Sequence, residues 1–148
     1  KLCEHNDACM FVTLFYAVYD LNTGTLDYVN GGHNPPFIRR NRGMYEQLPT
    51  DPGFALGVVP GKVYRTQRVR LSRSDRIFCY TDGVTEAVNS RRELFGEARL
   101  LDTLNSANFV LKPLNDKLRV MMDRLDAFTE GVPQADDITM LIFEARIL

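Results

Sequence analysis

The 148-residue sequence has few of the residues that build disulfide frameworks or zinc sites. It contains three cysteines, Cys3, Cys9 and Cys79, and two histidines, His5 and His33. An odd number of cysteines without closely spaced pairs fits neither a disulfide-stapled fold nor a zinc site. Cys79 falls inside an apolar run, which is typical of a small buried side chain. Reduced thiols favour a cytoplasmic location.

Long apolar runs and basic tracts are also missing. No stretch approaches the ~18 apolar residues that a membrane span requires, and the N-terminus shows no signal peptide. The formal net charge is −1, so we expect neither nucleic acid nor a membrane as a partner of this segment. Hydrophobic residues make up 45% and charged residues 25% of the chain, as in ordinary globular domains. We therefore expect one domain over residues 1–148 with a real core.

The hydrophobic pattern predicts several strands. Residues 10–20 are rich in β-branched and aromatic residues, and both alternating sets of side chains are largely apolar. A strand with two apolar faces needs cover on both, so we expect this one to be central in a layered fold. Further strands are expected at 25–30, 37–40, 44–48, 63–71, 77–80 and 138–143.

Two later segments have the spacing of one-faced helices. Apolar residues repeat at helical intervals between Leu94 and Leu104, and again between Leu114 and Phe128. The second pattern places a leucine and methionine stripe in the core. It directs a charged set outward: Asp116, Lys117, Arg119, Asp123, Arg124 and Asp126.

The strand at 77–80 stops abruptly at Thr81-Asp82-Gly83. An aspartate at the point where the chain leaves a sheet is held in a fixed position, which suits chemistry. Gly83 allows either a positive φ or the close approach of a ligand. An ordinary Asx turn is the alternative interpretation for an isolated Asp-Gly pair.

A second acidic element, Asp136-Asp137, lies just before the last expected strand. If this strand and the 77–80 strand are antiparallel neighbours, Asp82 and Asp136 meet at one edge of the sheet. Such carboxylates repel one another unless a cation lies between them. Oxygen-only ligands favour Mg²⁺ or Mn²⁺, which can bind a phosphoryl group and activate water. The alternative is an Asp-Asp pair that only turns the chain into the strand.

Residues 30–36 contain two glycines and two prolines, which predict a rigid loop. His33 in this loop is a candidate catalytic or ligand histidine. We favour the alternative of a loop histidine bonded to backbone, because no second histidine lies at ligand spacing.

Five strings occur in order along the chain: F-V-T-L-F-Y at 11–16, N-G-G-H-N-P-P at 30–36, L-G-V at 56–58, Y-T-D-G-V-T-E-A at 80–87 and A-D-D-I-T at 135–139. Together they resemble the stage II sporulation protein E / RsbU branch of the metal-dependent PPM-type (type 2C) serine/threonine phosphatases. The ordered set spans nearly the whole chain, so the resemblance is specific.

The resemblance implies an α+β fold, an α/β/β/α sandwich of two antiparallel sheets flanked by helices. It also implies two Mn²⁺ or Mg²⁺ ions and water attack on a phosphoserine or phosphothreonine. Asp82 and Asp136 match the catalytic metal ligands of the family. Supporting or structural positions are Gly83, Asp137, Thr139, His33 and Asn34. The implied substrate is a phosphorylated anti-anti-sigma (STAS-type) protein in bacterial signalling, with a sensor or receiver domain upstream.

The chain departs from the family at its start. The family's G-D-x-x-D and G-D-V-x-G-x-G strings are absent from residues 1–10, and Asp7 stands in no such context. We therefore expect a domain without its N-terminal strands and with half of the metal ligands. Its free sheet edges favour pairing with another chain or a homodimer. An inactive pseudophosphatase or regulatory binding module is the alternative function, and an unrelated metal-binding β-sandwich is a third hypothesis.

Overall fold

The computed structural model describes residues 2–3, 6, 9–51 and 53–147. These residues form two antiparallel sheets with strand orders β1-β2-β5 and β4-β3-β6-β7. The elements are β1 (Leu14–Asp20), β2 (Thr25–Gly31), β3 (Phe37–Arg39), β4 (Tyr45–Gln47), β5 (Gln67–Arg70), β6 (Arg76–Tyr80), α1 (Asp82–Thr85), α2 (Gly96–Asn105), α3 (Ala107–Val110), α4 (Leu114–Thr129) and β7 (Met140–Glu144). In this part of the chain, no helix is long and apolar enough to cross a membrane.

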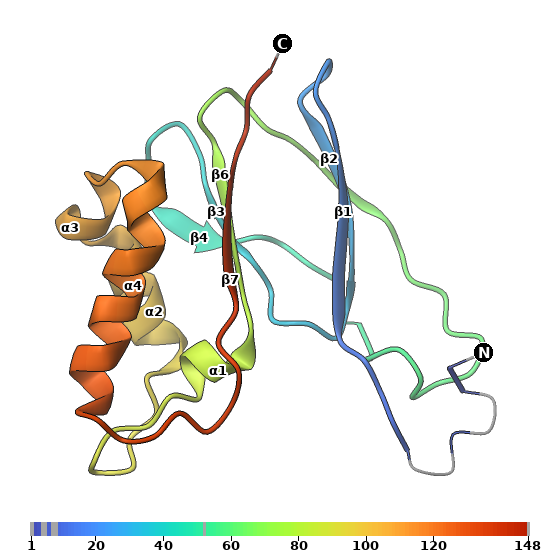
Figure 1. Ribbon diagram of the computed structural model, residues 1–148. Coiled ribbons are helices and arrows are strands. Elements are labelled where there is room, and N and C mark those ends of the chain that lie inside the picture. The colour runs from blue at the N-terminus through green and yellow to red at the C-terminus, as the bar shows by residue number, and fades with distance from the viewer. Residues whose placement is uncertain (1, 4–5, 7–8, 52, 148) are drawn as a thin grey trace.

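The two sheets stack face to face, and the helices cover the outer face of the four-stranded sheet (Figure 1). This arrangement confirms the expected α+β fold of two antiparallel sheets with helices. Within the described residues, the helices lie on one side of the stack, so the outer face of the β1-β2-β5 sheet carries no helix (Figure 1).

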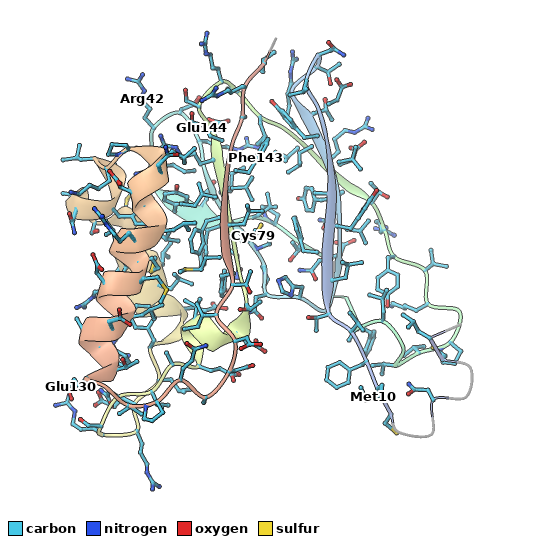
Figure 2. All side chains as sticks on the ribbon, in the orientation of Figure 1. Met10, Arg42, Cys79, Glu130, Phe143 and Glu144 are labelled. Carbon is cyan, nitrogen blue, oxygen red and sulfur yellow. The ribbon has the colours of Figure 1, made fainter. Side chains whose placement is uncertain are left out.

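Strand β6 separates two hydrophobic cores because its side chains alternate between faces. Phe78 and Tyr80 pack with the buried residues of α2, α3 and α4. Ile77 and Cys79 face the other sheet, and Figure 2 shows Cys79 and Phe143 in the space between the sheets. Burial raises the pKa of the Cys79 thiol to about 11, as expected for a small apolar-packed side chain.

The expectation that the first strand is central is wrong. Strand β1 is an edge strand that pairs only with β2 among the described residues. Leu14, Tyr16 and Val18 on its outer face are 42%, 58% and 53% exposed. The doubly apolar pattern correctly indicates two faces that favour burial, but the described residues cover only one of them. The strand expected at 63–71 is also shorter, since Val63 is 85% exposed and β5 begins at Gln67.

Helix α2 begins later than its pattern predicts, and it buries a different set of residues. It starts at Gly96, leaving Leu94 53% exposed before the helix. The buried residues of α2 are Leu100, Thr103 and Leu104. The one-turn helices α1 and α3 were not expected at all, because a single turn leaves no repeating hydrophobic pattern.

Lys117 on α4 is buried, which contradicts its expected outward direction. Its side chain is 0% exposed, and its Nζ donates hydrogen bonds to the carbonyl oxygens of Phe109 and, at 3.0 Å, of Val110. The ammonium also lies 4.8 Å from the centre of the Phe109 ring. Lys117 therefore satisfies carbonyl groups at the end of α3, which the helix itself leaves without donors.

Candidate functional site

Strands β6 and β7 bring the two acidic elements to the same end of the four-stranded sheet. They are antiparallel neighbours in which Tyr80 pairs with Met140. One residue beyond this pair, the Thr81 amide donates to the Thr139 carbonyl at 3.0 Å. Asp82 follows Thr81 directly, and Asp136 lies three residues before Thr139. The expected antiparallel pairing is confirmed, whereas the chemical roles of Asp82 and Asp136 stay predictions.

The side chain of Thr81 joins the two segments. Its Oγ1 donates to the Asp137 carbonyl at 2.9 Å and accepts from the Thr139 amide at 2.9 Å. The sequence interpretation did not single out Thr81, although it lies in the T-D-G string. Its partners depend on the register between strands that are almost 60 residues apart in the chain, and no local pattern reveals that register.

Gly83 is required by a close approach of the chain to itself. A Cβ atom on Gly83 would lie 2.5 Å from the Asp137 carbonyl oxygen and 3.2 Å from that of Asp136. Gly83 does not have a positive φ, so that expected reason for a glycine is wrong. The other expected reason, close approach of a ligand, stays a prediction, because the group that lies against Gly83 is the backbone of the Asp136-Asp137 segment.

The two aspartates are held in different ways. Asp82 is the first residue of α1, and its carbonyl accepts from the Glu86 amide at 2.8 Å and from Thr85 Oγ1 at 3.1 Å. Its exposed carboxylate forms no hydrogen bond with the residues that the structure describes. Asp136 is also exposed, and its Oδ1 accepts from the Asp137 amide at 2.7 Å.

The donor set fits part of a metal centre. Carboxylate oxygens are the ligands that Mg²⁺ and Mn²⁺ prefer, and Asp82 and Asp136 offer them from one sheet edge. However, no group of three or more His, Cys, Asp or Glu side chains suited to a metal ion occurs in the described ranges. Two aspartates are too few for a dinuclear centre. Asp7, another acidic residue near the start, lies outside the described residues.

His33 and Asn34 lie in the loop after β2, half-buried. The His33 amide donates to Asn30 Oδ1, and Asn30 Nδ2 donates to the His33 carbonyl, both at 2.8 Å. The His33 ring has its Nδ1 3.2 Å from Thr13 Oγ1. Together with Cys79 it lines a cavity of about 410 Å³ between the sheets. No described hydrogen bond joins this loop to Asp82 or Asp136.

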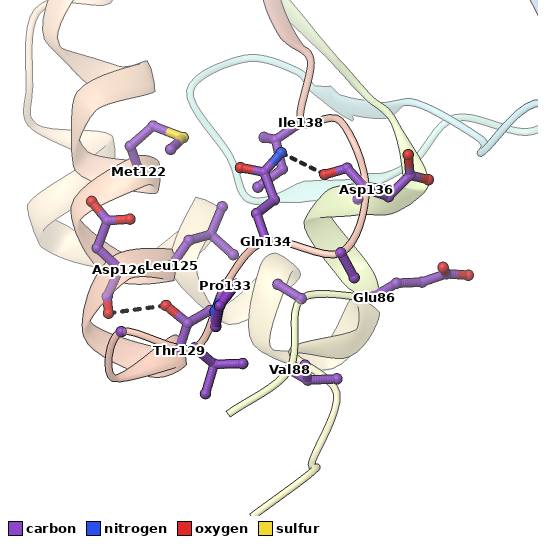
Figure 3. A pocket seen from close by; sticks show the side chains of 15 residues that line it. Glu86, Val88, Met122, Leu125, Asp126, Thr129, Pro133, Gln134, Asp136 and Ile138 are labelled. Atoms are coloured by element: carbon purple, nitrogen blue, oxygen red, sulfur yellow. Dashed lines mark hydrogen bonds between the residues drawn. The ribbon is translucent and has the colours of Figure 1, made fainter. Parts of the chain in front are cut away.

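We call the end of the β6–β7 pair that carries Asp82 and Asp136 the acidic edge. A separate pocket of about 380 Å³ lies beside it. Figure 3 shows it between α4, with Met122, Leu125 and Thr129, and the segment that carries Gln134 and Asp136. Gly83 of α1 and Glu86, which directly follows α1, also line the pocket. The pocket is thus lined in part by the two segments that carry Asp82 and Asp136.

Comparison with known proteins agrees with this architecture. The family model for stage II sporulation protein E (SpoIIE) matches residues 1–146. Protein IcfG of Synechocystis sp. (strain ATCC 27184 / PCC 6803 / Kazusa) is 38% identical over 138 residues, covering 93% of this chain and 21% of IcfG. Phosphoserine phosphatase RsbU of Bacillus subtilis (strain 168) is 27% identical over 152 residues, covering 99% of this chain and 43% of RsbU. The chain therefore spans less than half the length of these two relatives.

Solved structures show the same fold. The RsbU and RsbW domains of a Mycobacterium tuberculosis protein superpose with a TM-score of 0.78 at 22% identity, covering 97% of this chain and 38% of that one. The Mn-presoaked phosphatase domain of SpoIIE from Bacillus subtilis gives a TM-score of 0.67 at 15% identity, covering 90% and 56% of the two chains. Because the SpoIIE family model matches residues 1–146 of the 148-residue chain, the chain belongs to the SpoIIE family.

Proposed function

We propose that this chain is the C-terminal portion of a metal-dependent protein phosphatase domain that hydrolyses phosphoserine or phosphothreonine on a partner protein. The observation that carries the proposal is the placement of Asp82 and Asp136 at one edge of the β6–β7 pair in a SpoIIE-family chain. The relative RsbU is a phosphoserine phosphatase, which supports this substrate class.

In this proposal Asp82 and Asp136 hold Mn²⁺ or Mg²⁺, two ions in the complete domain. A bound ion of this kind supplies positive charge for the phosphoryl oxygens and lowers the pKa of water. Thr81 fixes the distance between the two segments through its hydrogen bonds to Asp137 and Thr139. Gly83 lets the Asp136 backbone lie against α1. The remaining metal ligands come from residues outside the described set.

The proposed partner is a phosphorylated anti-anti-sigma (STAS-type) regulator in bacterial, cytoplasmic signalling. The RsbU-type neighbour that carries an RsbW domain in the same protein supports a partner-switching setting. Because the chain covers 21% of IcfG and 43% of RsbU, we also propose a sensor or receiver domain in the parent protein.

A homodimer is the second part of the proposal. Among the described strands, β1 and β5 are the edges of one sheet, and β4 and β7 are the edges of the other. Figure 1 shows β1 and β7 as the foremost strands of their sheets. Unpaired strand edges next to exposed apolar side chains favour pairing with another chain.

The alternative function, a catalytically inactive pseudophosphatase or regulatory binding module, is favoured by one observation. The described residues offer no cluster of three metal-binding side chains. If residues preceding this segment in the parent protein also lack acidic metal ligands, the binding-module function is preferred.

Hydrolysis of p-nitrophenyl phosphate and of phosphoserine peptides by the full-length protein with Mn²⁺ tests these alternatives. We expect Mn²⁺-dependent turnover that falls at least about a hundredfold in Asp82→Asn and in Asp136→Asn. Asp102→Asn, an exposed change on α2 away from the two aspartates, is the matched control and keeps full activity. Wild-type turnover that persists in the two site variants would contradict their roles, and no turnover in the wild type would favour the binding module.

A further inference from the structure

The pocket beside the acidic edge combines an apolar wall with a negatively charged rim. Its apolar lining includes Met122 and Leu125 of α4 and Ile138 before β7, and Leu125 is only 2% exposed. The charged lining residues are Glu86, Asp126 and Asp136, all exposed. Among the residues that the structure describes, no lysine or arginine lines the pocket.

The three carboxylates have no cationic partner in the described part of the chain. The ion pairs there join Arg68 with Asp27, Arg76 with Glu144 and Arg91 with Glu93. Figure 3 places Asp126 on the α4 side of the pocket, and Glu86 and Asp136 on the opposite side. Residues that carry carboxylates therefore line the pocket from both sides, and the Glu86 side chain extends away from α4 (Figure 3).

We infer that this pocket binds a lysine or arginine side chain of the phosphoprotein substrate, close in sequence to the phosphorylated residue. The inference rests on the proposed phosphatase function. Lysine and arginine have a long apolar stem that can contact the Leu125 and Met122 wall, and a cationic end that reaches exposed carboxylates. A volume of about 380 Å³ is ample for one such side chain.

The position of the pocket links this side chain to the reaction site. Asp136 belongs both to the pocket rim and to the candidate metal pair, and Gly83, next to Asp82, lies in the pocket wall. A peptide whose phosphate lies at Asp82 and Asp136 passes the pocket mouth within a few residues. The basic residue would also offset repulsion between the acidic edge and an approaching phosphoprotein.

Phosphoserine peptides with lysine, norleucine or glutamate at each position from four residues before to four after the phosphoserine test the inference. The measured quantity is the ratio of kcat/KM between the lysine and norleucine peptides for each protein variant. We expect one position at which lysine is favoured about three- to tenfold in the full-length wild type. In Asp126→Asn this ratio falls toward one, whereas Asp102→Asn, an exposed change on α2 outside the lining of this pocket, retains it. In Asp126→Lys the preference shifts to the glutamate peptide.

The outcomes separate this inference from the function on which it rests. If the wild type hydrolyses p-nitrophenyl phosphate but no position favours lysine, the pocket assignment is overturned and the phosphatase function stands. A lysine preference that is equal in the wild type, Asp126→Asn and Asp126→Lys also overturns it. Absence of p-nitrophenyl phosphate hydrolysis in the wild type overturns the phosphatase function itself.

Discussion

Gly83 and Asp137 lie so close that a single methyl group would not fit between them: a Cβ on Gly83 would be 2.5 Å from the Asp137 carbonyl oxygen. This contact presses the segment before β7 against the first turn of α1. The same turn begins with Asp82, and the same segment carries Asp136. The separation of the two candidate ligands therefore depends on a glycine that is not itself expected to touch metal or substrate.

Gly83→Ala should displace the 136–137 backbone. We expect the free energy of unfolding to fall by about 1–3 kcal/mol, as for other substitutions that overpack a filled site, with a larger loss of Mn²⁺-dependent turnover. Gly43→Ala is the control, because its Cβ would lie 3.0 Å from the Arg40 carbonyl, in a turn between β3 and β4. Urea unfolding and phosphatase assays measure the two effects. Equal activity in the two variants would show that the Gly83 contact does not position the site.

Thr81→Val should weaken the connection between β6 and the segment before β7. The substitution keeps the shape of the side chain but removes an acceptor for the Thr139 amide and a donor to the Asp137 carbonyl. We expect a loss of about 1–3 kcal/mol in unfolding free energy, measured by urea titration. Thr139→Val is the comparison, because no hydrogen bond of its hydroxyl occurs among the described residues. Similar losses in both variants would contradict the role given to Thr81.

Lys117 should make stability depend on pH in the alkaline range. Burial, with a smaller contribution from Arg76 and Arg39, lowers the pKa of its ammonium from 10.5 to about 8. Between these two values the unfolded chain binds the proton more readily than the folded chain, so the contribution of Lys117 to stability rises with pH. Below about pH 8 this contribution is constant and unfavourable.

The comparison with Lys117→Met isolates this effect, because tyrosine and cysteine groups titrate in the same range in both proteins. We expect the difference in unfolding free energy between wild type and variant to move in favour of the wild type from pH 8 to pH 10.5. The expected change is about 2 kcal/mol. Urea unfolding at a series of pH values measures it, and a constant difference would rule out a lowered pKa for Lys117.

Metal affinity of the 148-residue chain alone should be weak. Two exposed carboxylates from Asp82 and Asp136 form an incomplete site, so we expect an Mn²⁺ dissociation constant on the order of 0.1–1 mM. Asp82→Asn should weaken it further, whereas the full-length protein should bind more tightly. Isothermal titration calorimetry distinguishes these cases. Micromolar binding by the short chain would mean that the described residues supply more ligands than these two.

Val18→Lys should reduce self-association. Val18 is 53% exposed on the uncovered face of edge strand β1, where a charge opposes pairing with another copy. We expect a lower dimer fraction in sedimentation velocity, with little change in the monomer's unfolding. Val63→Lys is a matched control, since Val63 is 85% exposed in a loop outside the sheets. A dimer fraction equal to that of the wild type in both variants would exclude this face from the interface.

Local pattern was enough to predict β2, β6, β7 and α4, because each has a clear period and end signals. It was also enough to place Asp82 and Asp136 at strand ends. The position of β1 in its sheet could not be predicted. Two apolar faces show that both sides of the strand favour burial, but they do not show which other residues cover them. Lys117 was misassigned for a related reason. A helical period cannot show that the end of α3 presents free carbonyl groups to that side chain.

Thr81 and the neighbour of Gly83 were missed because their partners lie across a strand pairing whose register involves distant parts of the chain. The sequence marks these residues only through the T-D-G string. The sequence shows which residue types occur at the acidic edge. The structure shows that the Thr81 hydroxyl and the lack of a Cβ at Gly83 set the separation between α1 and the segment before β7.

Because β6 lies between two cores, its position determines how the site is lost when the protein unfolds under heat or denaturant. Its side chains belong alternately to the helix-facing core and to the core between the sheets, and the strand leads directly into Asp82. Melting of either core removes half of the packing that holds the strand end. The geometry of the acidic edge therefore survives only as long as the less stable core. The thermal limit of the site is set by the weaker half of the fold, however strongly the other half is packed.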